Sequence, residues 1–571
     1  HVWISRTPAG EISQQLKSIE DRRRAGERLP LFGVPVAVKD SLDVAGLPTT
    51  LACPDFAYTP DVSAFAVKRL TDAGAIVVGK TNLDQFATGL VGARSPYGAC
   101  RSVFGRDLIS GGSSSGSAVA VAANMVPLAV ATDTAGSGRV PAMFNNIVGH
   151  KPTRGLISAA GLVPACQSID CVTVMALTCR DAAEMAAVMA GYDEAYPYSR
   201  RVAVSDVPAS VRGGKFTFGR PADGQLEFFG NAAYAAAWRA AIETARRAGG
   251  TEVVIDFAPF LEAGRLLYVG PWVAERVVAL GRFWETNRDS LFPVTRKILE
   301  GAAAHSAVGT FDAMHKLAAL RRRAEAELRK ADVLLMPTAG TTYTVPQVEA
   351  DPVRTNSNLG YYTTFANLLD LSALAIPAGF TADGLPFGVT LVADAGGDAT
   401  LYAVGSRLEA AADLPAGGTG TKPHRAEAIF KVPAAAPTAG DVVQVAVVGA
   451  HLSGLPLNHQ LTDAGGRLVR AAVTAPFYRF YALPGTVPPK PGMVRSPERQ
   501  ATGIELEVWE LSAAAFGRFV AAIPPPLGIG SVELADGAWV KCFLCEPHAV
   551  AGAAEITSLG GWRAYMASRG K

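Results

Sequence analysis

A run of glycine and serine that leads directly into an apolar segment is the strongest constraint on the fold of this 571-residue chain. The run is Gly-Gly-Ser-Ser-Ser-Gly-Ser at 111–117, and the uncharged apolar segment occupies 118–123. Glycine permits tight or left-handed backbone conformations, and serine can cap a helix and leave backbone N–H groups free. A flexible linker would rarely continue at once into such a segment. The pattern therefore predicts a turn that begins a buried helix.

A second turn of similar composition follows at 132–139, where the sequence is Thr-Asp-Thr-Ala-Gly-Ser-Gly-Arg. Like the first turn, it adjoins apolar segments. Two neighbouring turns that carry hydroxyl groups are typical of a site where one serine attacks and another transfers its proton. The two turns together indicate a candidate catalytic site.

Strand-like and helix-like segments alternate up to about residue 415, which predicts an α/β fold with a mixed central sheet flanked by helices. One of the expected helices begins at Asn82 and continues through Leu90. Glycine, proline and alanine then dominate 416–440, and short strands follow from residue 442. We therefore expect a first domain at 1–415, a linker at 416–440, and a small α+β barrel-like domain at 441–571.

The composition excludes several functional classes. Hydrophobic residues make up 49% and charged residues 18%, which is typical of a compact globular enzyme. The formal net charge is +2, so no global field recruits nucleic acid or an anionic membrane. No uninterrupted apolar stretch is long enough to cross a bilayer. The seven irregularly spaced cysteines predict reduced thiols and a cytoplasmic location, and the initial His indicates a missing N-terminus.

Two well-known motifs occur in the sequence, but their surroundings do not suit them. Residues 74–81 satisfy GxxxxGKT, yet the middle residues are a β-branched apolar strand rather than a phosphate-binding loop. Residues 112–116 satisfy GxSxG, but the preceding segment is polar instead of an apolar strand. The remaining hypothesis is a serine nucleophile whose base is a lysine kept neutral by burial or nearby positive charge. Lys39 and Lys80, each at the end of an apolar strand, are the alternatives.

Five segments, taken in order, resemble the amidase signature family: 31–40, 79–82, 111–117, 132–137 and 149–153. This resemblance implies a triad in which Ser137 is the nucleophile, Ser113 on a cis peptide bond transfers the proton, and Lys39 is the base. It also implies an oxyanion hole and two supporting residues, without any metal or cofactor. The oxyanion hole would consist of the backbone N–H groups of Thr134, Ala135, Gly136 and Ser137, and the supporting residues would be Ser114 and Asp133. His150 stands where the family usually has an apolar residue, so we expect a structural role for it.

The segment 267–276 and three C-terminal segments, 448–458, 481–484 and 560–563, are similar to the allophanate hydrolase branch of that family. This likeness implies that Tyr268 and Arg276 hold the substrate, since a guanidinium can bind the carboxylate of allophanate bidentately. It implies hydrolysis of the terminal amide to ammonia and N-carboxycarbamate, which then loses carbon dioxide, during urea degradation. A C-terminal fold like gamma-glutamyl cyclotransferase, a homodimer and a urea carboxylase as functional partner are also implied.

Several alternatives remain open from the sequence. In the C-terminal domain, His451 and His548 are candidates for the decarboxylation, and each could equally be structural. The chain could instead be a broad-specificity amidase, or the amidase subunit of an amidotransferase. Its C-terminal domain would then be a non-catalytic module for docking or oligomerisation.

Overall fold

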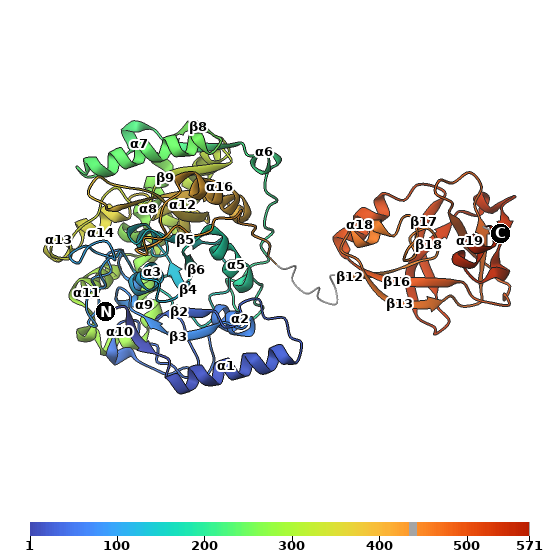
Figure 1. Ribbon diagram of the computed structural model, residues 1–571, viewed down its shortest axis with the longest axis horizontal. Helices are drawn as coiled ribbons and strands as arrows, with labels where there is room; N and C mark the ends of the chain where they lie inside the picture. The colour runs from blue at the N-terminus through green and yellow to red at the C-terminus, as the bar shows by residue number, and fades with distance from the viewer. Residues whose placement is uncertain (433–441, 570–571) are drawn as a thin grey trace. The chain divides into compact units, whose positions relative to one another are not determined.

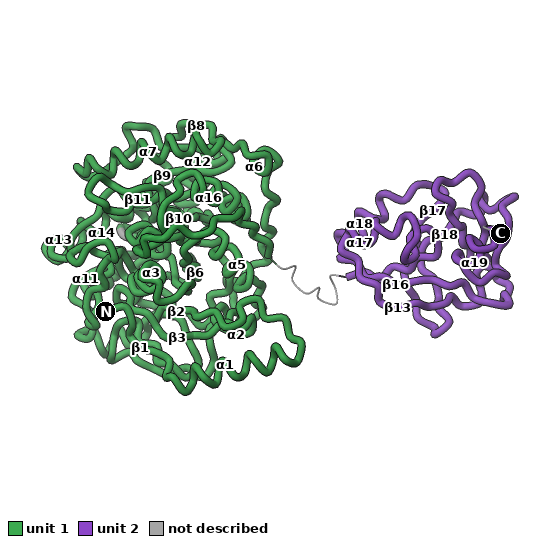
Figure 2. The backbone as a smooth tube through the Cα atoms, viewed as in Figure 1, with its two compact units in different colours: residues 1–433 green, residues 434–571 purple. Residues whose placement is uncertain are grey.

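The structure, a computed structural model, describes residues 1–432 and 442–569 (Figure 1). The chain divides into two compact units, residues 1–433 and 434–571 (Figure 2). Each unit has a hydrophobic core of its own. The two units are therefore described separately.

Within residues 1–432, the first unit is built on a mixed sheet of eleven strands in the order β1-β3-β2-β4-β6-β5-β10-β11-β9-β7-β8. Strand β2 runs parallel to β3 and β4, and β7 runs parallel to β8 and β9, whereas the other neighbours are antiparallel. The predicted α/β fold with a mixed sheet is confirmed. The strands are β1 (Trp3–Arg6), β2 (Pro35–Lys39), β3 (Ile76–Thr81), β4 (Leu128–Asp133), β5 (Val148–Lys151), β6 (Cys171–Ala176), β7 (Phe216–Pro221), β8 (Gly250–Ile255), β9 (Val333–Pro337), β10 (Ser372–Phe380) and β11 (Pro386–Ala393).

Helices cover both faces of this sheet (Figure 1). They are α1 (Ala9–Arg24), α2 (Phe65–Asp72), α3 (Ser115–Ala122), α4 (Val140–Phe144), α5 (Cys179–Met189), α6 (Ala209–Arg212), α7 (Ala232–Arg247), α8 (Ala258–Val269), α9 (Val273–Leu280), α10 (Arg282–Thr286), α11 (Pro293–Glu300), α12 (Ala307–Leu328), α13 (Val345–Ala350), α14 (Arg354–Leu359), α15 (Phe365–Leu368) and α16 (Asp398–Ala412).

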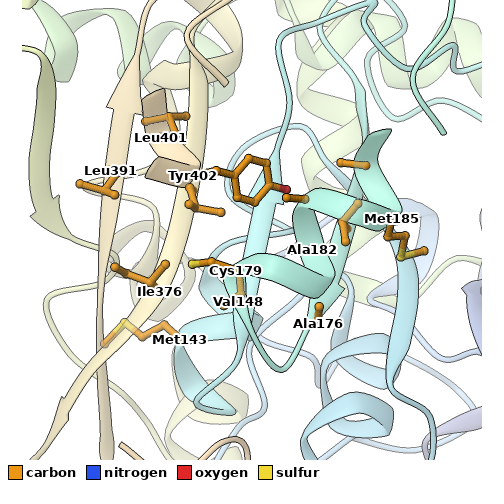
Figure 3. Close-up of a cluster of buried hydrophobic side chains, with 14 of the residues drawn as sticks. Met143, Val148, Ala176, Cys179, Ala182, Met185, Ile376, Leu391, Leu401 and Tyr402 are labelled. Carbon is orange, nitrogen blue, oxygen red and sulfur yellow. The ribbon is translucent and has the colours of Figure 1, made fainter. Parts of the chain in front are cut away.

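Alternation along the central strands separates the cores on the two faces. Val36 and Val38 of β2 pack in the core that also receives α2, α5, α7 and α16, whereas Ala37 packs with α3 on the other face. Successive side chains of a strand point to opposite faces, so one strand contributes to both cores. Figure 3 shows part of the larger core, where Tyr402 of α16 and Cys179 of α5 lie beside the strands.

Residues 416–432, which the sequence suggested as part of a linker, pack against the first unit. Asn146 Nδ2 donates to the carbonyl oxygen of Gly417 at 3.1 Å, and the Gly417 N–H donates back to the Asn146 carbonyl at 2.9 Å. Gly417 has a φ of +52°, in the left-handed region that favours glycine. Further along, Ala428 and Phe430 are buried in the larger core. This segment is therefore structurally part of the first unit.

Across its described residues, the second unit contains a five-stranded sheet, β13-β16-β12-β18-β17, and a three-stranded sheet, β15-β14-β19. Helix α18 packs on the larger sheet, and the predicted small α+β domain is confirmed. The elements are β12 (Val442–Val447), α17 (His459–Thr462), β13 (Arg467–Val473), β14 (Tyr478–Ala482), β15 (Pro491–Arg495), β16 (Glu505–Ser512), α18 (Ala513–Ala521), β17 (Leu527–Glu533), β18 (Trp539–Cys545), β19 (Ala554–Glu555) and α19 (Trp562–Arg569).

Two further properties bear on the sequence-based expectations. All seven cysteines are free, buried thiols, including Cys542 and Cys545 of the CxxC segment. Among residues 1–432 and 442–569, every helix is too short or too polar to span a lipid bilayer.

Candidate active site

Lys39 is the last residue of β2, a central strand with β3 on one side and β4 on the other, and its side chain is 0% exposed. The strand delivers the amine to the hydroxyl groups of the two predicted turns. Lys39 Nζ lies 2.8 Å from Ser113 Oγ, 2.9 Å from Ser114 Oγ and 2.7 Å from Thr132 Oγ1. The amine is thus surrounded by three neutral hydroxyl partners.

Burial lowers the pKa of Lys39 to about 7, against the attraction of Asp84, Asp170 and Asp133, while Arg276 adds to the lowering. A neutral amine has two N–H donors and one lone pair. Three hydroxyl contacts match that set, because two hydroxyl oxygens can accept while the third group donates to the nitrogen. The geometry therefore suits a lysine that accepts a proton from a serine near neutral pH.

Ser113 and Ser114 lie in the turn immediately before α3. The peptide bond between Gly112 and Ser113 is cis, and all residues of α3 are buried, so the predicted turn into a buried helix is confirmed. The Asp84 N–H donates to the Ser113 carbonyl at 3.1 Å. A Cβ on Gly112 would lie 2.1 Å from Asp84 Oδ2, so only glycine leaves room for that carboxylate. Asp84 therefore holds the turn from one side.

Ser137 lies in the loop between β4 and α4 and is buried. The Asp133 carboxylate, at the end of β4, accepts the Gly136 N–H at 2.8 Å and Arg139 Nε at 2.9 Å. Burial acts to raise the pKa of Asp133, but the Arg139 guanidinium outweighs it and lowers that pKa. Gly136 has a φ of +124°, and a Cβ there would lie 2.3 Å from Thr363 Oγ1. The loop is thus held by a buried ion pair and a required glycine.

Arg276 enters the same region from α9 and is only 4% exposed. Its Nη1 donates to Thr88 Oγ1 at 2.9 Å and to the Ala87 carbonyl at 3.3 Å. Its charge is close enough to lower the pKa of both Lys39 and Asp170. Tyr268 belongs to α8, but its side chain lies outside the described part of the chain.

Sequence reasoning missed three side chains that shape this site: Thr132, Asp84 and Asp170. Thr132 contacts the Lys39 amine directly. Asp170 is buried one residue before β6, and its carboxylate accepts the Thr134 hydroxyl. The pairing of Asp133 with Cys171 in the β4–β6 ladder explains this contact. A polar residue immediately before a buried strand was the available indication for Asp170.

Lys80 and His150 have other partners. Lys80 Nζ lies 3.3 Å from Asp40 Oδ1 and 3.0 Å from Thr49 Oγ1, and Gly79-Lys80-Thr81 continues strand β3, as the sequence predicted. His150 Nε2 lies 3.1 Å from Asp398 Oδ1, and burial lowers the pKa of His150. Both side chains are therefore engaged away from the hydroxyl groups around Lys39.

The helix predicted from Asn82 through Leu90 is wrong. This segment contains only a short 3-10 turn at Gln85–Ala87, and Phe86 and Ala87 have φ values of +53° and +52°. The Asp84 carboxylate accepts the Val91 N–H at 3.1 Å. A buried carboxylate that binds backbone N–H groups competes with helical hydrogen bonds, and the chain folds around it instead.

The two histidines proposed for the C-terminal unit differ in their surroundings. His451 lines a cavity of about 300 Å³, together with Gln460, Lys490 and mainly apolar side chains. His451 Nε2 lies 2.9 Å from Gln460 Oε1, its ring stacks on Phe543, and burial lowers the pKa of His451. His548 is exposed, with Nδ1 3.3 Å from Glu546. Of these two histidines, His451 is the one that lines a cavity.

Comparisons with known proteins agree with this architecture. Residues 5–402 match the amidase family, and residues 443–567 match the allophanate hydrolase C-terminal domain. Urea amidolyase of Saccharomyces cerevisiae is 42% identical over 575 residues, covering 99% of this chain and 31% of that protein. The chain thus spans about a third of the length of such curated relatives.

Two further matches cover different parts of the chain. The structure of Kluyveromyces lactis allophanate hydrolase is 41% identical, with a TM-score of 0.72, and the match covers 99% of this chain and 93% of that one. One of the subunits of glutamyl-tRNA(Gln) amidotransferase from Acidobacterium capsulatum is 34% identical, covering 72% of this chain and 91% of that protein.

Proposed function

Because this chain belongs to the amidase family and ends in an allophanate hydrolase C-terminal domain, we propose that it hydrolyses the terminal amide of allophanate. The products are ammonia and N-carboxycarbamate, and the reaction is a step of urea degradation. The contact of the buried Lys39 amine with Ser113 Oγ at 2.8 Å, beside the Ser137 loop, carries the proposal. The names of the relatives that match nearly the whole chain support this substrate.

In this mechanism Ser137 is the nucleophile, Ser113 transfers the proton and Lys39 is the base. As Ser137 Oγ bonds to the amide carbon, its proton passes to Ser113, whose own proton passes to Lys39. The C–N bond then breaks, the leaving nitrogen takes a proton, and ammonia departs. Water attacks the acyl-enzyme by the same proton path and regenerates Ser137. Ser114, which donates to the Thr132 carbonyl at 3.1 Å, supports the amine.

The negative oxygen of the tetrahedral intermediate needs N–H donors in the loop of Ser137. Of the four groups expected from the resemblance, the Gly136 N–H donates to Asp133 at 2.8 Å. We therefore assign the oxyanion hole to Thr134, Ala135 and Ser137, and we assign Gly136 and Asp133 to shaping the loop.

Arg276 and Tyr268 bind the carboxylate end of allophanate in this proposal. Replacing Arg276 by glutamine should lower kcat/KM for allophanate about 100-fold, because a buried charged partner of the substrate is lost. Turnover of a small neutral amide should change little. Arg282→Gln, at an exposed arginine in neighbouring α10, is the matched control. Equal losses on allophanate and the neutral amide would exclude a carboxylate clamp.

For the second step we propose that the C-terminal unit uses the cavity of His451 rather than the exposed His548. His451 would give a proton to the nitrogen of N-carboxycarbamate as the C–N bond to one carboxylate breaks, which yields carbamate and carbon dioxide. Carbamate then decomposes to ammonia and carbon dioxide. His451→Ala should leave the first ammonia unchanged and delay release of carbon dioxide, whereas His548→Ala should change neither.

The competing hypothesis is that the C-terminal unit is a docking module on a broader amidase. Removing residues 434–571 separates the two ideas. Slower carbon dioxide release at an unchanged first turnover supports the decarboxylation, whereas an unchanged ammonia yield with a changed molecular mass supports docking. We further propose a homodimer that acts after a urea carboxylase. Light scattering tests the dimer, and a coupled assay with urea carboxylase tests the partnership.

A further inference from the structure

Asp170 makes more contacts to the site than a residue of the surrounding core would need. One carboxylate oxygen accepts the Thr134 hydroxyl, and the other accepts the N–H groups of Ala165 and Cys166 at 2.7 and 3.1 Å. Thr134 is three residues before Ser137, in the loop that also carries the oxyanion hole of the proposed reaction. The Asp170 side chain thus fixes that loop from the side of strand β6.

The turn that Asp170 organises also contacts the helix that carries Arg276. Cys166 Sγ lies 3.4 Å from the carbonyl oxygen of Trp272, directly before α9. The N–H and hydroxyl groups of Ser168 donate to Glu275 Oε2 at 3.2 and 3.0 Å. The residue after Glu275 is Arg276. The segment 165–170 therefore joins the loop of the nucleophile to the helix of the substrate-binding arginine.

We infer that Asp170 is a positioning residue that holds Thr134 beside the nucleophile and places a negative charge within reach of both Lys39 and Arg276. This inference rests on the proposed function for the roles of Ser137, Lys39 and Arg276. It adds a residue that binds no substrate and acts through its neighbours.

The charges around Lys39 give this role a measurable sign. Asp84, Asp133 and Asp170 act to raise the pKa of Lys39, and Arg276 acts to lower it. Burial raises the pKa of Asp170 to about 6, with the Thr134 hydroxyl and Arg276 opposing the rise, so Asp170 is ionised where Lys39 titrates. Cys166 and Tyr196 also feel the Asp170 charge. Removing this charge should therefore lower the pKa of Lys39.

Asp170→Asn in the full-length enzyme tests the inference. An asparagine can still accept the Thr134 hydroxyl, but its NH₂ group then meets the N–H groups that bind the second oxygen. We expect kcat to fall about 10-fold or more, since an oxyanion donor is worth about 10²–10³ in kcat and is here displaced rather than removed. The acid limb of kcat/KM should move to lower pH. A variant with wild-type kcat and an unmoved acid limb would overturn the inference.

Asp398→Asn is the matched control. Asp398 is a buried carboxylate that also accepts a threonine hydroxyl and a backbone N–H, both from Thr153, but its partner is His150. This variant should lower the melting temperature and leave the acid limb in place. If both variants move the acid limb equally, the effect is general and the inference fails.

Thr134 variants keep the inference testable if Asp170→Asn does not fold. Thr134→Val removes the hydroxyl and retains the N–H, and it should lower kcat about 10-fold. Thr134→Ser restores the hydroxyl and should keep kcat within about twofold of wild type. Wild-type kcat in Thr134→Val would overturn the inference. Should the wild type cleave malonamate or biuret but not allophanate, the proposed function fails, and the same variants on the accepted amide decide the inference separately.

Discussion

The ends of two adjacent parallel strands, β2 and β3, offer a comparison within one sheet. Each carries a lysine, Lys39 or Lys80, whose side chain is 0% exposed. Lys39 contacts three hydroxyl groups, whereas Lys80 forms an ion pair with Asp40 at 3.3 Å. Burial lowers the pKa of both amines, and Asp40 opposes that effect at Lys80. Burial alone therefore does not make a base; the two positions differ in whether hydroxyl groups or a carboxylate meet the amine.

The largest expected effect comes from removing the amine of Lys39. Lys39→Ala should reduce kcat about 10⁴-fold, the usual loss when one member of a catalytic triad is removed. Lys39→Arg should be similarly inactive, because a guanidinium remains protonated and cannot accept the serine proton. Steady-state assays on protein checked by circular dichroism measure this. A Lys39→Ala variant with a tenth of wild-type kcat would remove the basis of the comparison.

Lys80→Met should affect stability instead of chemistry. It leaves the buried Asp40 carboxylate without its cation, so the free energy of unfolding should fall by about 3–5 kcal/mol. Activity per folded molecule should be retained. Urea denaturation measures the loss, and the double variant Lys80→Met, Asp40→Asn should recover part of it. A loss below about 1 kcal/mol would show that the ion pair contributes little.

The pH dependence of the reaction sharpens the contrast further. The acid limb of kcat/KM should have its midpoint near pH 7, because Lys39 with a pKa of about 7 must be neutral to act as a base. Below that midpoint, the rate should fall about tenfold for each pH unit.

Stability gives an independent measure of the same group. The pKa of Lys39 is lowered in the folded state, so between pH 7 and its ordinary value the unfolded chain binds the extra proton. The free energy of unfolding should therefore rise with pH over that window relative to Lys39→Met. A difference between the two proteins that does not change with pH would place the amine's pKa near its ordinary value.

The smallest expected effect concerns the third hydroxyl around Lys39. Thr132→Val removes one partner of the amine and should lower kcat about 10-fold, the cost of one lost hydrogen bond. Ser117→Ala is the control, because Ser117 Oγ pairs with Thr81 Oγ1 at 2.7 Å and is also buried. Equal losses in both variants would mean that packing, rather than the contact with Lys39, explains the effect.

Much of this arrangement could be predicted from local sequence. The apolar, β-branched residues of 76–78 correctly indicated a strand where a phosphate-binding pattern also matched. The small residues after the serine turn correctly indicated the buried helix α3. Both features depend on residues close together in the chain, and local composition is sufficient for them.

The errors and omissions depend on partners distant in sequence. The helix expected at 82–90 fails because the Asp84 carboxylate binds backbone groups of the next turn, which no periodicity reveals. Asp170 contacts Thr134 only because β4 and β6 pair antiparallel, and that register was not available from the sequence. The polar groups of the site were therefore identified by motif, whereas the groups that hold them required the structure.

The path of residues 416–432 determines where the protein can be divided. Low sequence complexity near 416–420 suggests a cut there, but such a fragment would lose Phe430 and Ala428 and expose the surfaces they cover. Solubility and yield of an isolated hydrolase half should therefore depend on about seventeen residues that resemble dispensable spacer. Engineers who fuse or exchange modules at this junction should place the seam after residue 432.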